Sequence, residues 1–457
     1  MHFIKFTFIR DNYIHDGGWN CSGIHLYNCI NGILENNTCS TFDPNGIDLI
    51  LSSCNILNNN TCTDNYCGIS LIYYSDNNTL INNNCSNNGY GIHLEGANSS
   101  TLINNNCSNN YDGITFYRSY NNTLIDNNCS NNGHGIDLSS SSSNTLINND
   151  CSNSDRGICL SHSSNNILSG NILNENGIII YGAVLFHWNT HDIEVSNKVN
   201  GKPVYYYKNQ TGITVPDGAG QVILANCTDF VIENQNLSHA DIGISLGFSS
   251  NSLIANNNCS DNYRGIYLAF SSNNTLINNN CSSNSDSGIE LIFSNDNILS
   301  NNNCSSNNYE GISLLYSSNN TIIWNQLYNN IICGIYAYSD FIITTPCSYN
   351  LIWNNTFYHN NGAGDSYDPS HIQAYDDGTN NWWNSSSGYG NYWSDWTTPD
   401  GDMNGIVDNP YNIDGSAGAK DFYPQTTAPI IPEPAILILV GTMMMLFLII
   451  GRTRKKN

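Results

Sequence analysis

The sequence has little charge, and most of that charge is negative. Only 11% of its 457 residues are charged, and 13 Lys and Arg stand against 37 Asp and Glu, which gives a formal net charge of -24. Such a chain repels the phosphates of DNA and RNA, so we exclude a nucleic-acid partner. Methionine is scarce as well, because only Met1 and Met403 precede the C-terminal apolar segment. The sequence therefore lacks a methionine-rich copper motif.

The body of the chain also lacks stretches suited to a long α-helix. Asn and Ser clusters interrupt it every few residues, and the apolar residues between them alternate with the two-residue period of a β-strand. From Gly265, for example, the side chains of Ile266, Leu268 and Phe270 fall on one face. Disordered chains can also be rich in Asn and Ser, but they lack such regularly placed apolar residues. We therefore predict an ordered all-β protein.

A Gly-Ile pair marks a repeat of about 22 residues. Stacked copies of one strand, about 4.8 Å apart, satisfy each other's backbone hydrogen bonds and bury a common core. We predict a right-handed parallel β-helix, an all-β solenoid of about fourteen coils, over residues 1–375. The glycines of these pairs are Gly23, Gly46, Gly68, Gly91, Gly113, Gly135, Gly157, Gly177, Gly243, Gly265, Gly288, Gly311 and Gly334.

Stacking also aligns aromatic residues, five positions after the repeat glycine. Because this position is in phase with the buried Ile and Leu, we expect an aromatic stack inside the solenoid, and an exposed sugar-binding track is the alternative. Asparagines at the bends should form amide ladders. The aromatic residues are Tyr73, Phe248, Phe270, Phe293 and Tyr316.

Many of the 17 cysteines form a second regular column. A column of thiols could bind Cu(I), but other coils have Ile14, Leu237 or Phe357 at the same position, which indicates an apolar interior position. We therefore predict core packing, and disulfides between stacked neighbours have unsuitable side-chain directions. The column comprises Cys39, Cys62, Cys85, Cys107, Cys129 and Cys151, and then Cys259, Cys281 and Cys304.

Residues 181–240 lose the Gly-Ile mark, and we interpret them as modified coils with an insertion. This segment contains the best histidine pair, His187 and His191. On a strand these side chains would share a face, but at about 13 Å apart they could bind one copper ion only with a bend between them. A polar surface without a metal is the alternative.

Residues 376–424, with Trp382, Trp383, Trp393 and Trp396, are predicted to form a C-terminal cap that covers the last coil. Within the cap lies a pattern similar to a calcium-binding loop, with Gly405 at the bend. Its twelfth position is Tyr411 instead of Glu, so another carboxylate, Asp395 or Asp414, would have to contribute; a turn rich in Asp and Asn is the alternative. The predicted Ca²⁺ ligands are Asp400, Asp402, Asn404, Ile406 and Asp408.

The C-terminus has the composition of a membrane anchor. We predict a linker at 425–434, a transmembrane or sorting helix at 435–451 and a cytoplasmic basic tail at 452–457, with the body outside the cell. Pro432-Glu433-Pro434 before the apolar run resembles a sorting signal that a sortase-like protease processes. No signal peptide is visible at the start, which indicates a truncated N-terminus.

Several motifs resemble the NosD family of periplasmic copper-binding β-helix proteins, whose domain is grouped with carbohydrate-binding and sugar-hydrolase (CASH) β-helices. The resemblance covers most of residues 20–424 and matches archaeal surface members. It implies copper delivery to an extracytoplasmic enzyme, although many surface members have no assigned role. The motifs are NKVNGKPVYYYKN (197–209), AGQVILANCT (219–228), GNYWSDW (390–396), DGDMNGIVDNPYNI (400–413) and DFYP (421–424).

The outward positions show no convergent catalytic group. Arg156 and Arg264 look isolated, Asp137 and Glu290 stand in distant coils, and the pair Asp376-Asp377 is expected in a solvated loop. We name no catalytic residue and leave the question of catalysis open. The sequence favours a cell-surface scaffold with a structural, adhesive or glycan-binding role, with surface glycans or envelope proteins as partners and Asn-X-Ser/Thr sequons suited to glycosylation. An accessory copper-binding protein and a polysaccharide lyase or hydrolase are the alternatives.

Overall fold

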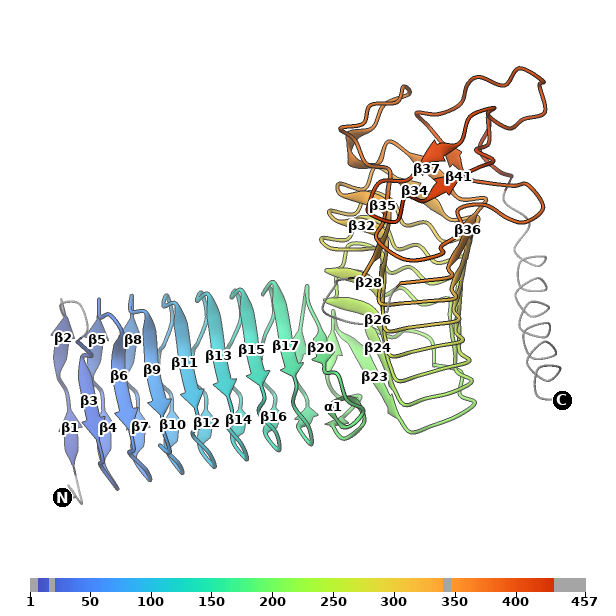
Figure 1. Ribbon diagram of the computed structural model, residues 1–457. Coiled ribbons are helices and arrows are strands. Elements are labelled where there is room, and N and C mark those ends of the chain that lie inside the picture. Colours follow the sequence, from blue (N-terminus) through green and yellow to red (C-terminus); the bar gives the residue numbers. More distant parts are fainter. Residues whose placement is uncertain (1–6, 16–20, 340–346, 431–457) are drawn as a thin grey trace. The chain divides into compact units, whose positions relative to one another are not determined.

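The computed structural model describes residues 7–15, 21–339 and 347–430 (Figure 1). It is an all-β parallel solenoid of about fourteen coils, which confirms the predicted parallel β-helix. The chain forms two compact units: unit 1 comprises residues 1–208 and 239–241, and unit 2 comprises 209–238 and 242–457.

Each coil of unit 1 contributes a long strand and a short strand to two separate parallel sheets. Long strands form the sheet β3 (Ile24–Tyr27), β6 (Asn45–Ile50), β9 (Cys67–Ile72), β11 (Tyr90–Glu95), β13 (Asp112–Tyr117), β15 (His134–Ser139), β17 (Arg156–Ser161) and β20 (Ile178–Tyr181). Short strands form the sheet β1 (Phe8–Arg10), β4 (Ile33–Glu35), β7 (Ile56–Asn58), β10 (Thr79–Ile81), β12 (Thr101–Ile103), β14 (Thr123–Ile125), β16 (Thr145–Ile147), β18 (Ile167–Ser169) and β21 (Asp192–Ile193).

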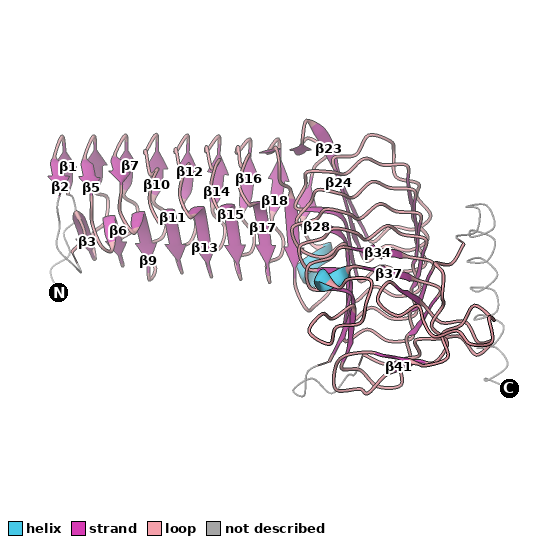
Figure 2. Ribbon diagram, turned by 90° about the horizontal axis from the view of Figure 1, so that it is seen from above, coloured by secondary structure: helices cyan, strands magenta, loops and turns pink. Residues whose placement is uncertain are grey.

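The remaining elements of unit 1 lie at the third side of its coils and in its last, irregular coils. Only one short α-helix, α1, interrupts the strands among the described residues of this unit (Figure 2). These elements are β2 (Tyr13–His15), β5 (Thr38–Ser40), β8 (Thr61–Thr63), β19 (Ile172–Leu173), α1 (Phe186–Asn189), β22 (Lys198–Val199) and β23 (Lys202–Lys208).

Unit 2 repeats the same plan. Its long strands are β24 (Gln221–Ala225), β26 (Ile242–Gly247), β28 (Arg264–Ala269), β30 (Ile289–Ile292), β32 (Glu310–Leu315), β35 (Cys333–Tyr338) and β38 (Ala374–Asp376). The short strands are β25 (Val231–Glu233), β27 (Leu253–Ala255), β29 (Thr275–Ile277), β31 (Ile298–Ser300), β33 (Thr321–Ile323) and β36 (Leu351–Trp353). Smaller elements are β34 (Gln326–Tyr328), β37 (Thr356–Tyr358), β39 (Tyr392–Trp393), β40 (Tyr411–Asn412), β41 (Lys420–Asp421) and the 3-10 helix Asn360–Gly362.

The core consists of rows of like residues from successive coils. Ile114 pairs in register with Ile136, and Leu102 with Leu124, and all four are fully buried. Every cysteine of the predicted column is fully buried too, and no disulfide forms among the described residues. The interpretation of this column as core is confirmed, because a thiol packs there as a small apolar group.

Buried asparagines close the turns, as the sequence predicts. The side chain of Asn105 donates to Asn127 Oδ1 of the next coil at 2.9 Å and to the carbonyl of Leu80 at 3.0 Å. Its own Oδ1 accepts from the backbone and side-chain amides of Asn83. Each asparagine of the ladder therefore forms hydrogen bonds with the next asparagine and with the turn backbone. These bonds offset the free-energy cost of burying the polar groups.

The aromatic column is real, but its predicted place inside the solenoid is wrong. Phe248, Phe270 and Phe293 stack with ring centroids 4.7 and 5.1 Å apart, yet each ring remains partly exposed. Phe270 has a φ of +52°, so the backbone turns there, and the fully buried side chain is that of the following Ser271. The left-handed bend ends the strand alternation on which the prediction relied.

The C-terminal part of unit 2 is closed by stacked aromatic rings. Trp393 lies between Phe357 and Tyr411, with centroids 4.1 Å from each. Asp376 is fully buried and accepts a hydrogen bond from Trp383 Nε1 at 2.8 Å, so the expectation of a solvated Asp376 is wrong. A buried carboxylate needs such donors, and the indole supplies one.

Among the described residues, no helix has the length and apolar character that a membrane crossing needs. The predicted span at 435–451 and the basic tail at 452–457 lie outside the described residues, as do the Pro432-Glu433-Pro434 motif and the first six residues.

Candidate functional site

The outward face of the long-strand sheet in unit 1 is hollowed by a cavity of about 330 Å³. Strands β6, β9, β11, β13 and β15, which follow one another in Figure 1, supply nearly all of its lining. Because the strands come from consecutive coils, residues about 22 positions apart in sequence meet in this cavity. The lining residues are Asn45, Tyr66, Cys67, Ser70, Tyr90, His93, Asp112, Thr115, Phe116, Tyr117, Asp137 and Ser139.

The cavity contains a column of outward side chains two positions after the repeat glycine. Register pairs place Ser70 beside His93, His93 beside Thr115, and Thr115 beside Asp137. Small hydroxyl side chains thus alternate with larger, titratable ones. At a coil spacing of about 4.8 Å, His93 and Asp137 stand about 10 Å apart, with Thr115 between them.

Burial favours the neutral form of His93. Its Nδ1 lies 2.8 Å from Thr115 Oγ1, and its Nε2 lies 4.0 Å from a carboxylate oxygen of Glu95. Burial lowers the pKa of His93, although the charges of Glu95 and Asp112 act in the opposite direction. The imidazole therefore stays largely unprotonated at neutral pH.

Asp137 and Asp112 occupy different electrostatic surroundings. Burial raises the pKa of Asp137, whose carboxylate accepts from Ser139 Oγ at 3.3 Å. Asp112 instead forms an ion pair with His134, 3.1 Å from its Nδ1, and this contact raises the pKa of His134. Burial therefore favours the protonated form of Asp137, whereas Asp112 is held against an imidazole.

Sequence reasoning missed this cluster. Arg156 stands beside His134 in register, two coils from Asp112, and its charge acts on Asp137, so the interpretation of Arg156 as isolated is wrong. The signal was available in the outward columns one position before and two positions after each repeat glycine. Individual coils conceal it, because each coil contributes only one or two of the residues.

Tyrosines border the cavity. Tyr66 is 57% exposed and packs edge-on against Tyr90, with centroids 5.4 Å apart. Tyr117 is also exposed, and Tyr90 lies 5.8 Å from the ring of His93. Aromatic rings beside hydroxyl and carboxyl groups provide both apolar contact area and hydrogen-bonding partners for one ligand.

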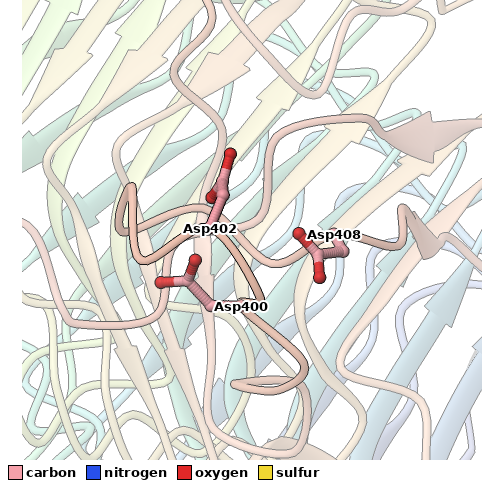
Figure 3. Close-up of side chains that lie close together, drawn as sticks. All are labelled: Asp400, Asp402 and Asp408. Atoms are coloured by element: carbon pink, nitrogen blue, oxygen red, sulfur yellow. The ribbon is translucent and has the colours of Figure 1, made fainter.

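The three predicted aspartates of the calcium-like loop do lie together (Figure 3). Carboxylate oxygens of Asp400, Asp402 and Asp408 lie within 4.8 Å of one another. However, Asp400 accepts from the backbone amides of Asn404 and Gly405, both at 3.1 Å, and Asp408 from that of Gly401. Exposed carboxylates engaged in this way are also typical of turns rich in Asp and Asn.

Other residues of this loop pattern make hydrogen bonds within the protein. Asn404 Oδ1 accepts from the amide of Ile406 at 2.8 Å. Tyr411 is buried in the aromatic stack, and its hydroxyl donates to Asp395 at 3.4 Å. Calcium binding by this loop stays a prediction.

The predicted copper pair does not lie on a strand. His187 belongs to the helix α1, and His191 follows shortly after its end. His191 is fully buried, with Nε2 at 2.9 Å from the carbonyl of His187 and Nδ1 accepting from the amide of Asn166 at 3.2 Å. Both ring nitrogens are thus engaged, and burial lowers the pKa of His191 to about 4.

His191 is in fact a rung of an asparagine ladder. Asn122 and Asn144 accept the equivalent backbone hydrogen bonds in the preceding coils, and His191 takes the place of the next asparagine after Asn166. In the cysteine column, burial raises the pKa of Cys85 and favours its thiol form. Copper binding at His187 and His191 stays a prediction.

Comparison with known proteins identifies one family. The family model described as "Periplasmic copper-binding protein (NosD)" matches residues 5–110, 68–194 and 185–398. No curated protein matches the chain significantly.

Comparison with solved structures finds several that are similar to the chain. The periplasmic alginate epimerase AlgG is 12% identical, with 67% of this chain and 76% of that chain covered and a TM-score of 0.30. The mannuronan C-5 epimerase AlgE4 A-module of Azotobacter vinelandii is 13% identical, with 77% and 86% covered and a TM-score of 0.29. PfbA, a surface adhesin of Streptococcus pneumoniae, is 10% identical, with 77% and 82% covered and a TM-score of 0.29. At these TM-scores, none of the three carries an argument about this chain.

Proposed function

The chain belongs to the NosD family, and from this premise we propose that it is an extracytoplasmic β-helix scaffold that binds neutral glycans in the cavity of unit 1. The family is described as periplasmic, which supports an extracytoplasmic location for this chain. Retention at the cell surface would depend on the segment 435–451, outside the described residues. The solenoid provides a rigid frame, and the cavity provides the binding chemistry.

The cavity is the observation that carries this proposal. Its volume of about 330 Å³ is at the small end of the range for ligand pockets, about 300–1,000 Å³, which suits one or two sugar rings of a longer chain. Tyr66 and Tyr90 offer apolar ring surface, and Ser70, Thr115 and Asp112 offer donors and acceptors for sugar hydroxyls. The ligand would be held by contacts that need no metal.

Charge restricts the class of glycan. The cavity contains Asp112 and Asp137, and the whole chain has a net charge of -24. Carboxylates that line a cavity repel uronate or sulfated sugars and tolerate neutral or amino sugars. Neutral glycans are therefore the preferred ligands of this proposal.

A glycan array tests the proposal with the full chain. We expect binding to neutral glycans. Tyr90→Ala should raise the Kd for such a glycan at least tenfold, because it removes a ring that lines the cavity. Tyr27→Ala is the matched control, since Tyr27 is 58% exposed on β3 and does not line the cavity. An array without any bound neutral glycan, or equal losses in the two variants, would refute glycan binding at this site.

A further inference from the structure

The cavity also brings together two groups suited to proton transfer. We propose that it hydrolyses a glycosidic bond of the glycan it binds, with His93 as the general base and Asp137 as the general acid. This inference rests on the proposed function, because the glycan must first occupy the cavity.

The position of the two residues supports a displacement by water. His93 and Asp137 belong to one outward column, two coils apart, and Thr115 lies between them. Their separation of about 10 Å between Cα atoms leaves room for a bridging sugar oxygen and a water molecule. Inverting glycosidases hold their two catalytic carboxyl groups about 6.5–9.5 Å apart for the same reason, a separation that two outward side chains with Cα atoms about 10 Å apart can reach.

The hydrogen bonds of His93 select its reactive nitrogen. When Nδ1 carries the proton and donates it to Thr115 Oγ1 at 2.8 Å, Nε2 retains a free lone pair. Nε2 has only the distant Glu95 carboxylate, at 4.0 Å. Burial lowers the pKa of His93, so this lone pair is available at neutral and mildly acidic pH.

Asp137 has complementary properties. Burial raises its pKa, against the opposing influence of His134, and a larger fraction of the carboxyl group therefore carries a proton. Its neighbour Asp112 is instead engaged by His134, whose Nδ1 lies 3.1 Å from the carboxylate. Asp137 is therefore the group that can protonate a leaving oxygen.

The reaction consumes one water molecule and no other reagent. His93 Nε2 takes a proton from water while the water oxygen forms a bond to the anomeric carbon. The bond from that carbon to the bridging oxygen breaks, and Asp137 donates its proton to this oxygen. The products are a new reducing end of inverted configuration and a free hydroxyl group. Protons exchanged with solvent return both residues to their initial states.

The pH profile should have a maximum at mildly acidic pH. Asp137, which faces His134, Asp112, Arg156 and Cys159, loses its proton as the pH rises, and His93, which faces Glu95, Asp112 and Tyr90, gains one as the pH falls. Both changes stop proton transfer. We expect the maximum between 3.8 and 6.5, the ordinary pKa values of the two groups.

The experiment uses the full chain and the neutral glycan that the array captures best. After incubation in ¹⁸O-labelled water, mass spectrometry should find one labelled oxygen at each new reducing end. Asp137→Asn and His93→Gln should each slow cleavage at least 100-fold and leave Kd within about threefold. Asp126→Asn is the control, because Asp126 is exposed and the equivalent positions of the adjacent coils are already Asn104 and Asn148.

The outcomes separate the two proposals. A glycan that binds and stays intact, or cleavage at the wild-type rate in both variants, overturns the hydrolysis and leaves glycan binding standing. If the array captures no glycan, glycan binding itself fails and hydrolysis with it. Both glycan binding and hydrolysis are supported if the Asp126→Asn variant still gives labelled products and the Asp137→Asn and His93→Gln variants do not.

Discussion

Asn127 is a rung of the amide ladder that closes the turns of unit 1. Its side chain donates to Leu102 and Asn149 and accepts from Asn105, all at 2.9–3.0 Å. The adjacent Asn128 is exposed and bonds Asn106 on the outer surface. Two neighbouring asparagines thus have different structural roles, which depend only on the face they occupy.

We expect Asn127→Ala to lower the free energy of unfolding by about 3 kcal/mol, because it leaves buried backbone groups without partners. Asn128→Ala, the same change one position later, should cost less than about 1 kcal/mol. Urea unfolding followed by circular dichroism measures both. Similar losses in the two variants would contradict the role assigned to the inner ladder.

His191 makes stability depend on pH. Its pKa is about 4 in the folded chain and 6.5 in the unfolded chain, so between these values only the unfolded state gains a proton. Stability should therefore be full above pH 6.5 and should fall by about 3 kcal/mol as the pH decreases to 4. His191→Asn, which restores the asparagine of the ladder, should remove this dependence when unfolding is measured across pH 4–7.

The His191→Asn variant also tests whether His191 binds copper. Because both ring nitrogens of His191 are engaged in hydrogen bonds, copper titration of His191→Asn should match that of the wild type. Loss of a tight copper site in this variant alone would instead support the accessory copper-binding role.

At the scale of the element, the long strands β26, β28, β30 and β32 of unit 2 each end in a bend that changes the direction of the next side chain. In β28, Leu268 points into the core and is fully buried, whereas Phe270 follows the strand at positive φ and stacks on the surface. The repeat pattern of the sequence correctly predicts that these aromatic rings stack. It cannot predict on which side of the coil they stack, because the bend reverses the strand alternation.

We expect Phe270→Ala to destabilise the chain by about 2 kcal/mol, since it removes two stacking contacts of a partly exposed ring. Leu268→Ala should cost more, about 2–5 kcal/mol, because it leaves a cavity in the core. Thermal unfolding of both variants tests the order. A larger loss for Phe270→Ala would indicate that its ring is an inward core residue.

At the scale of the whole molecule, contacts across many coils complete the structure. In unit 1, the carboxylate of Asp241 is fully buried and accepts from the amides of Gly157 and Gly177, at 2.9 and 3.0 Å. These partners are 84 and 64 residues away in sequence. The repeat pattern does not predict this contact, because Asp241 directly follows the irregular segment 181–240, and no equivalent position in the described regular coils makes the same pair of hydrogen bonds to glycines that precede the segment.

The sequence by itself determined the parallel solenoid, the buried cysteine column and the asparagine ladders, because each depends on a spacing that repeats along the chain and every coil buries the same positions. Only the tertiary structure decided that the aromatic stack lies outside, that His191 is a ladder rung and that His93, Asp112 and Asp137 line one cavity. Those features depend on the direction of a bend or on groups contributed by different coils. Neither can be inferred from the sequence of a single repeat.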